Sequence, residues 1–110
     1  MKVIENKELK NEILDSNTNT IYKNCTLINC TNKGCTVIDS TWKSGIWKSG
    51  IWESGTWEDG IWESGTWYDG TWESGTWESG IWKDGTWKSG IWKGGIWING
   101  IWESGTNLQD

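Results

Sequence analysis

The sequence predicts an all-β fold in which the chain winds into a solenoid, and three features support this prediction. From Thr41 to Gly105 the chain consists of thirteen copies of one pentapeptide, [Thr/Ile]-Trp-x-x-Gly, with a tryptophan at every fifth position from Trp42 to Trp102. Thr, Ile and Trp favour strands, whereas Ser-Gly and Asp-Gly favour turns. The residue after Trp is charged in eleven of the thirteen copies, so we expect that position to face water and the neighbouring Trp to face the interior.

A period of five residues excludes both a helix and a flat sheet of hairpins. In a helix, five residues at about 100° each would spread successive tryptophans around every side, and each Gly would cost about 1 kcal/mol relative to Ala. In a flat sheet, an odd period would move Trp to the opposite face in each repeat. A chain that turns a corner once per pentad avoids both problems, because its coils then stack about 4.8 Å apart through backbone hydrogen bonds.

The phase of the repeat extends upstream of the tryptophans, because Cys25, Cys30 and Cys35 also recur every five residues. Read from Cys25, successive pentads are Cys-Thr-Leu-Ile-Asn, Cys-Thr-Asn-Lys-Gly, Cys-Thr-Val-Ile-Asp, Ser-Thr-Trp-Lys-Ser and Gly-Ile-Trp-Lys-Ser. In this frame the chain resembles the pentapeptide-repeat family, which repeats a small, a polar, a large apolar and two variable residues. The resemblance covers residues 21–106 and implies a right-handed, four-sided β-helix.

The resemblance also implies which side chains point inward. Two columns are implied, one of small and one of large residues: Cys25, Cys30, Cys35, Ser40 and the glycines from Gly45 to Gly100 in the first, and Tyr22, Leu27, Val37 and Trp42 to Trp102 in the second. Trp stands where the family usually has Leu or Phe, and Gly stands where it usually has Ala, so the larger residue is compensated by the smaller one. Asn32 in the large apolar column is a further departure. Thirteen tryptophans of about 200 Å² each carry roughly 2,600 Å² of surface, far beyond the exposed patch of about 600 Å² that monomers tolerate.

The three cysteines have two interpretations. Metal sites prefer closer pairs such as Cys-x₂-Cys, and the chain has no His to complete one. We therefore favour the interpretation that Cys is a small, readily buried residue at one repeat position, and we predict no metal site and no cofactor.

The ends of the chain depart from the repeat. We expect residues 1–20 to form an N-terminal cap, with a short helix in KELKNEIL that places Leu9 and Ile13 on one face, and residues 107–110 to form a short tail. The charged N-terminus lacks the apolar run of a signal peptide, and no segment has the length of a membrane span. These features predict a cytoplasmic or virion-associated protein.

The charge pattern does not distinguish a three-sided from a four-sided coil. Four sides would stack residues twenty apart, giving Lys43–Glu63–Lys83–Glu103 and Lys48–Tyr68–Lys88. Three sides would stack residues fifteen apart, giving Lys43–Glu58 and Glu73–Lys88–Glu103, which pair equally well. The family resemblance alone favours four sides.

The sequence indicates a structural or protein-interaction module, such as an assembly, scaffold or virion component, without catalytic activity. The chain has no His or Arg and no Ser or Cys beside a plausible base. Its low-complexity pentads resemble those of bacterial and phage proteins. Two alternatives remain open. One is an inhibitor of a nucleic-acid enzyme that mimics DNA through its acids; direct nucleic-acid binding is disfavoured by the net charge of -5. The other is a carbohydrate- or ice-binding surface, for which three sides would align Thr41, Thr56, Thr71 and Thr86.

Self-association through the C-terminal end is the partner prediction. Nothing after Gly105 resembles a cap, and Ile98 replaces a charged residue. An open solenoid end is a template for another chain, and either a two-fold dimer or a head-to-tail contact would use it. In a four-sided coil an outward apolar stripe would lead to this end. The predicted surface consists of Ile96, Ile98, Ile101, Trp102, Ile81 and Ile61.

Overall fold

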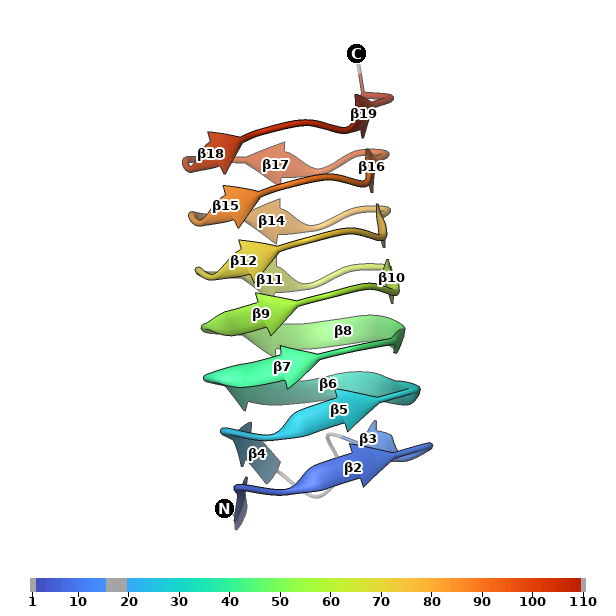
Figure 1. The fold of residues 1–110 in the computed structure, drawn as a ribbon, viewed down its shortest axis with the longest axis vertical. Helices are drawn as coiled ribbons and strands as arrows, with labels where there is room; N and C mark the ends of the chain where they lie inside the picture. The colour runs from blue at the N-terminus through green and yellow to red at the C-terminus, as the bar shows by residue number, and fades with distance from the viewer. Residues whose placement is uncertain (1, 16–19, 110) are drawn as a thin grey trace.

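The computed structural model describes residues 2–15 and 20–109, and over these ranges the chain is a rod of stacked parallel strands (Figure 1). The rod measures 39 × 21 × 21 Å and contains about seven coils, which confirms the predicted all-β solenoid. The strands are β1 (Lys2–Glu5), β2 (Glu8–Lys10), β3 (Ile13–Asp15), β4 (Thr20–Lys23), β5 (Thr26–Ile28), β6 (Cys30–Ile38), β7 (Ser40–Trp42), β8 (Gly45–Trp52), β9 (Gly55–Trp57), β10 (Ile61–Trp62), β11 (Thr66–Trp67), β12 (Thr71–Trp72), β13 (Thr76–Trp77), β14 (Ile81–Trp82), β15 (Thr86–Trp87), β16 (Ile91–Trp92), β17 (Ile96–Trp97), β18 (Ile101–Trp102) and β19 (Thr106–Asn107).

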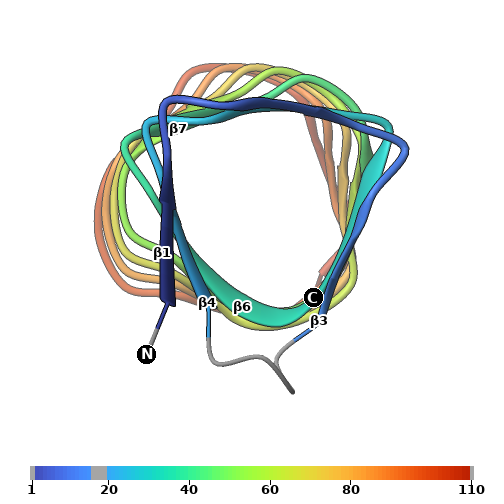
Figure 2. The ribbon, with the colours of Figure 1, turned by 90° about the horizontal axis from the view of Figure 1, so that it is seen from below.

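Each coil of the repeat has three sides, so the prediction of four sides is wrong. Trp62 pairs with Trp77 and Trp72 with Trp87, a separation of fifteen residues or three pentads. Seen from the N-terminal end, the chain runs clockwise as it recedes, so the coil is right-handed (Figure 2). In the interior of this three-sided coil, each indole meets the preceding and the following indole edge to face, as Trp62 meets Trp57 and Trp67.

The three sides are named here after one strand of each. The β10 side contains β3, β10, β13, β16 and β19 with the first part of β6 and β8. The β14 side contains β1, β4, β11, β14 and β17 with the last part of β6 and β8. The β15 side contains β2, β5, β7, β9, β12, β15 and β18. The chain visits them in the order β10 side, β14 side, β15 side.

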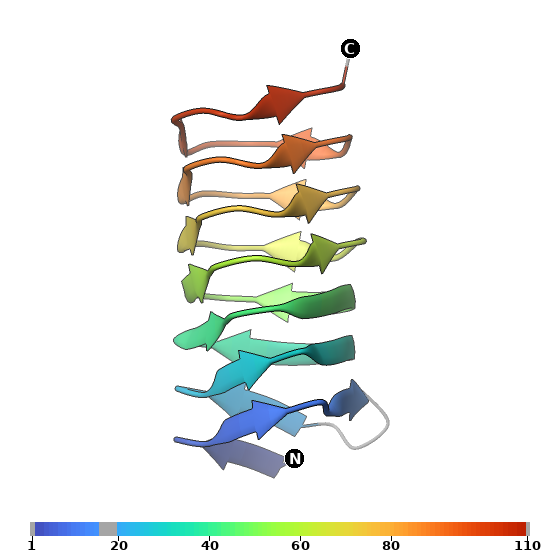
Figure 3. The same ribbon diagram turned by 45° about the vertical axis from the view of Figure 1, so that its right-hand side comes forward.

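Residues 2–15 form the first coil of the solenoid, and the helix predicted there is wrong (Figure 3). Strands β1, β2 and β3 pair with β4, β5 and β6 at an offset of eighteen residues instead of fifteen. Ile4, Leu9 and Leu14 point inward at the same five-residue spacing as the tryptophans, whereas Ile13 is exposed. Whether this coil acts as a cap stays a prediction: removal of residues 1–20 is expected to cause aggregation.

The corners change type along the rod. Where the small inward residue is Cys or Ser, the left-handed residue precedes it, as Asn24 precedes Cys25, and is Asn, Asp or Gly34. From Gly45 onward the glycine itself, at the small position, has a φ of about +116 to +127°. The residues with a positive φ of 49–58° are Asn6, Asn11, Asn24, Asn29 and Asp39. Asn and Asp tolerate this conformation, whereas a φ near +120° is restricted to Gly.

Candidate functional site: the C-terminal end of the tryptophan stack

The interior of the rod is a stack of indole rings. Each ring lies nearly parallel to the ring fifteen residues later, with centroids 4.7–5.2 Å apart and interplanar angles of 3–8°. Successive rings along the chain meet edge to face at 69–77°. Tryptophans from Trp42 to Trp87 are fully buried and Trp92 is nearly so, which confirms the predicted inward column. Both geometries are those that aromatic pairs prefer.

Glycine is required wherever the stack is present. A methyl group on Gly60 would lie 2.6 Å from the carbonyl oxygen of Gly45 and 3.2 Å from Nε1 of Trp42. Two coils therefore approach each other at the corner through their backbones, and the indole of the lower coil fills the remaining space. The predicted compensation between a large Trp and a small Gly is confirmed by this geometry.

The indole N–H groups point toward the same corners. Nε1 of Trp67 donates to the carbonyl of Asp84 and Nε1 of Trp77 to that of Gly94, both at 3.1 Å. A corner carbonyl thus accepts a hydrogen bond from the indole at these two positions. Eight buried indole N–H groups have no hydrogen-bond acceptor among the described residues: Trp42, Trp47, Trp52, Trp57, Trp62, Trp72, Trp82 and Trp87.

The cysteines occupy the small inward position, one on each of three successive corners, and all three are buried thiols. Cys30 Sγ contacts the carbonyl oxygen of Leu9 at 3.4 Å in the coil below. Burial raises the pKa of the Cys30 and Cys35 thiols, so both remain protonated at neutral pH. Their role as small core residues, which the sequence favours, is confirmed.

The stack is open at its C-terminal end. Trp97 and Trp102 have no ring above them and are only partly buried, unlike the tryptophans below. Together with Trp92, Asn107 and Gln109 they line a cavity of about 300 Å³. Among the described residues no strand lies above β17 or β18, so the upper faces of these two indoles are uncovered there.

A short lid covers one third of this end, which the sequence analysis missed. Asn107 takes the position of a tryptophan above Trp92, because β19 pairs with β16. The side chain of Gln109 accepts a hydrogen bond from Trp92 Nε1 at 2.7 Å and donates one to the carbonyl of Gly95 at 2.8 Å. The expectation that nothing after Gly105 resembles a cap is therefore wrong for the β10 side. An amide side chain after the last repeat is the signal that would have indicated it.

The predicted self-association surface is only partly brought together. Ile96, Ile98 and Ile101 are about 60% exposed and lie in the last coil with Trp102. Ile61 and Ile81 lie lower on the rod, and Ile61, Ile81 and Ile101 belong to three different sides. The outward stripe predicted for a four-sided coil is therefore wrong.

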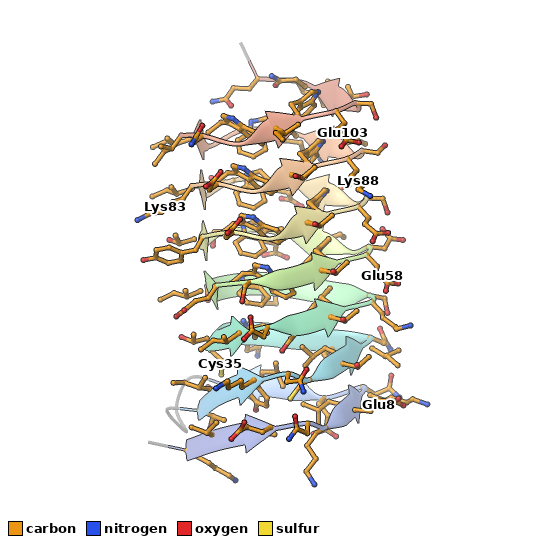
Figure 4. All side chains as sticks on the ribbon, turned by 60° about the vertical axis from the view of Figure 1, so that its left-hand side comes forward. Glu8, Cys35, Glu58, Lys83, Lys88 and Glu103 are labelled. Atoms are coloured by element: carbon orange, nitrogen blue, oxygen red, sulfur yellow. The ribbon has the colours of Figure 1, made fainter. Side chains whose placement is uncertain are left out.

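Charged side chains follow the three-sided register. Glu58, Lys88 and Glu103 line up along one edge of the rod, with Lys83 on the opposite edge (Figure 4). Among the described residues, the ion pairs are Lys48–Glu63 at 4.0 Å and Lys10–Glu8 at 3.4 Å. The ladders predicted for four sides are wrong, because their members lie on different sides. Instead, the Nζ of Lys83 lies 4.5 Å from the centroid of the Tyr68 ring.

Threonines form one continuous row on the β15 side. Thr26 pairs with Thr41, Thr41 with Thr56, Thr56 with Thr71, and Thr71 with Thr86. The row that the sequence predicts for a three-sided coil is thus present and extends one residue further down. Charged residues flank it, since Lys43, Glu58, Glu73 and Lys88 follow two positions after each of the last four threonines.

These features define the class of the protein: a three-sided parallel β-solenoid with a stacked tryptophan core and pentapeptide spacing. No protein-family model, curated protein or solved structure matches the chain. The resemblance to the pentapeptide-repeat family therefore rests on the repeat pattern, and the three-sided coil departs from that family's four sides. Within the described ranges there is no helix with the length and apolar character needed to cross a membrane.

Proposed function

We propose that this protein is a structural module that self-associates through the C-terminal end of its solenoid. The proposal includes no catalytic activity. It assigns to the rod the role of a stiff spacer or assembly unit, because a stacked solenoid keeps its shape and presents identical chemistry along its length. A fibre, scaffold or virion component would use both properties.

The observation that carries the proposal is the contrast between the last coil and those below it. From Trp42 to Trp92 every indole is buried, yet the faces of Trp97 and Trp102 are left open beside Ile96, Ile98 and Ile101. Contiguous exposed apolar surface is uncommon on monomers and marks interaction sites. Within the described residues, β17 and β18 have no strand above them, and such unpaired strand edges favour addition of another chain.

The area of the C-terminal end face limits the affinity of the proposed self-association. A cross-section of 21 × 21 Å gives an end face of about 440 Å² per copy, or about 900 Å² for two copies. Stable complexes bury about 1,200–2,000 Å² in total, so the contact falls in the weak class. We therefore expect dissociation constants in the micromolar range and assembly that depends strongly on concentration.

Sedimentation velocity and light scattering across about 5 to 200 µM test the proposal, because this range brackets a micromolar dissociation constant. The wild-type chain is expected to shift to larger species as concentration rises, and Ile101→Glu to remain monomeric. Ile51→Glu is the matched control, since Ile51 is an outward isoleucine in the middle of the rod, 37% exposed. A wild-type chain that stays monomeric throughout contradicts the proposal.

The threonine row favours a second candidate, binding to an ordered surface such as ice. Five threonines at the coil spacing present regularly repeated hydroxyl and methyl groups on the β15 side. The flanking charges at Lys43 and Glu58 oppose it, since they bind liquid water strongly. Thermal hysteresis of the wild-type chain, abolished by Thr56→Lys but retained by Ile51→Lys, is the expected result for this candidate. No hysteresis in the wild type rules it out.

A further inference from the structure

We propose that the partner of the C-terminal end is the N-terminal coil of a second copy, so that the chains stack head to tail into a filament. This inference rests on the proposed self-association and specifies its geometry. The occupant of the open end is thus the underside of β1, β2 and β3 of another molecule (Figures 1 and 3).

The three sides of the coil correspond at the two ends. The last strand, β19, lies on the β10 side, and the first strand, β1, lies on the β14 side, which is the next side in the winding order. A copy placed on top in the same orientation therefore continues the winding order of the three sides. Its β1 lies over β17, its β2 over β18 and its β3 over β19.

Backbone donors and acceptors also match. In each coil the amide of the outward residue before Trp and the amide after Trp donate to carbonyls of the coil below, as Thr86 does to Gly70 and Lys88 to Trp72. Three of the corresponding amides in the first coil, those of Glu5, Glu8 and Lys10, have no strand below them within the described part of the chain. The corresponding carbonyls of β17 and β18 likewise have no described strand above them. Stacking pairs the amides of Glu5, Glu8 and Lys10 with the carbonyls of Trp97, Gly100 and Trp102, respectively.

Exposed apolar residues occur at both ends, not only at one. The most exposed isoleucines are Ile13 (63%) at the N-terminal end and Ile101 (60%) at the C-terminal end, against 37–38% for the outward isoleucines Ile51 and Ile61. Stacking places Val3 beside Ile96 and sets the partly buried Ile4 and Leu9 over the indoles of Trp97 and Trp102. A two-fold contact between C-terminal ends would leave the N-terminal surface uncovered.

Side-chain charges agree with this arrangement. On the β15 side Lys10 of the upper copy follows Glu103 of the lower copy in the same column, giving an opposite-charge pair. Ile98 lies beneath Glu5 of the upper copy on the β14 side. Ile98→Lys is therefore expected to preserve or strengthen stacking, whereas it would weaken a two-fold contact in which Ile98 faces its own apolar surface.

A mixing experiment distinguishes the two arrangements. The variant Lys10→Glu/Ile13→Glu blocks the N-terminal end, since its new carboxylate at position 10 faces Glu103 of the lower copy. The variant Ile96→Glu/Ile101→Glu blocks the C-terminal end, since its new carboxylate at position 101 faces Glu8 of the upper copy. All four positions are exposed, so both variants retain the fold, which far-UV circular dichroism and tryptophan emission verify. The matched control is Ile51→Glu/Ile91→Glu, at outward isoleucines along the rod that are 37% and 38% exposed.

The expected result is that each blocked variant associates about tenfold or more weakly than the wild type, because like charges oppose contact. Their equimolar mixture forms a 1:1 dimer and nothing larger, whereas the wild type and the control form longer species. Dimerisation of the N-terminal variant alone overturns head-to-tail stacking but leaves self-association through the C-terminal end intact. A monomeric wild type, or variants that all assemble like the wild type, overturns both.

Discussion

Replacing Gly65 by Ala tests the close approach of coils on which the tryptophan stack depends. Gly65 has a φ of +120°, and a methyl group there would lie 2.5 Å from the carbonyl oxygen of Gly50, 3.1 Å from its nitrogen and 3.2 Å from Nε1 of Trp47. Backbone strain of this kind costs about 1–3 kcal/mol, and forcing a methyl into a filled site costs about 1–3 kcal/mol more. We therefore expect Gly65→Ala to lower the free energy of unfolding by about 2–6 kcal/mol.

Gly94→Ala is the control, because Gly94 lacks the positive φ and its added methyl would meet only the Glu78 carbonyl at an ordinary 3.5 Å. A compatible Gly→Ala change stabilises by about 0.4–1 kcal/mol through the unfolded chain, so the two variants should shift in opposite directions. Urea and thermal unfolding, followed by tryptophan fluorescence and far-UV circular dichroism, measure both. A Gly65→Ala midpoint within error of the wild type would refute the reasoning.

Three further predictions follow from the core. Asn32→Leu should lower the free energy of unfolding by about 1–3 kcal/mol although leucine is apolar, because the Asn32 amide forms hydrogen bonds with both the N–H and the C=O of Cys35. Equal urea midpoints for the variant and the wild type would contradict this. Burial raises the pKa of Tyr22, Cys30 and Cys35 in the folded chain. The free energy of unfolding should therefore be at its maximum below the ordinary pKa of a thiol and should fall as the pH rises through the raised pKa values of the folded state. Unfolding midpoints that stay unchanged at alkaline pH would argue against this. Tryptophan emission should be blue-shifted and resistant to acrylamide, and emission like that of free indole would contradict an inward stack.

The side-chain directions were predictable from the sequence because the repeat itself carries the information. A charged residue after almost every tryptophan requires an outward position, and alternation along a strand then turns the tryptophan inward. The resemblance to the pentapeptide-repeat family placed Asn32 in the inward column, and the structure adds why it is tolerated: its amide satisfies the backbone of Cys35.

The number of sides was not predictable from charge, because residues fifteen and twenty apart both gave favourable pairs. The threonine row held a better signal, since Thr26, Thr41, Thr56, Thr71 and Thr86 all recur at intervals of fifteen. The first coil was missed for a different reason. Ile4, Leu9 and Leu14 share the five-residue spacing, but Asn6 and Asn11 make the corners in place of glycine, and the apolar spacing there also suits a helix.

The two ends are where the chemistry of this chain differs from its repeat. Between Trp42 and Trp92 the indoles are buried against the coils above and below, and the described strands along that length are paired on both edges. At the C-terminal end the stack stops with Trp97 and Trp102 while only Gln109 closes one side, and at the N-terminal end aliphatic residues replace indoles of the same spacing. A weak contact of about 900 Å² can repeat along a filament only if every copy presents both an N-terminal and a C-terminal contact surface. In the proposed filament, the matched sides, amides and charges of the first and last coils meet that condition.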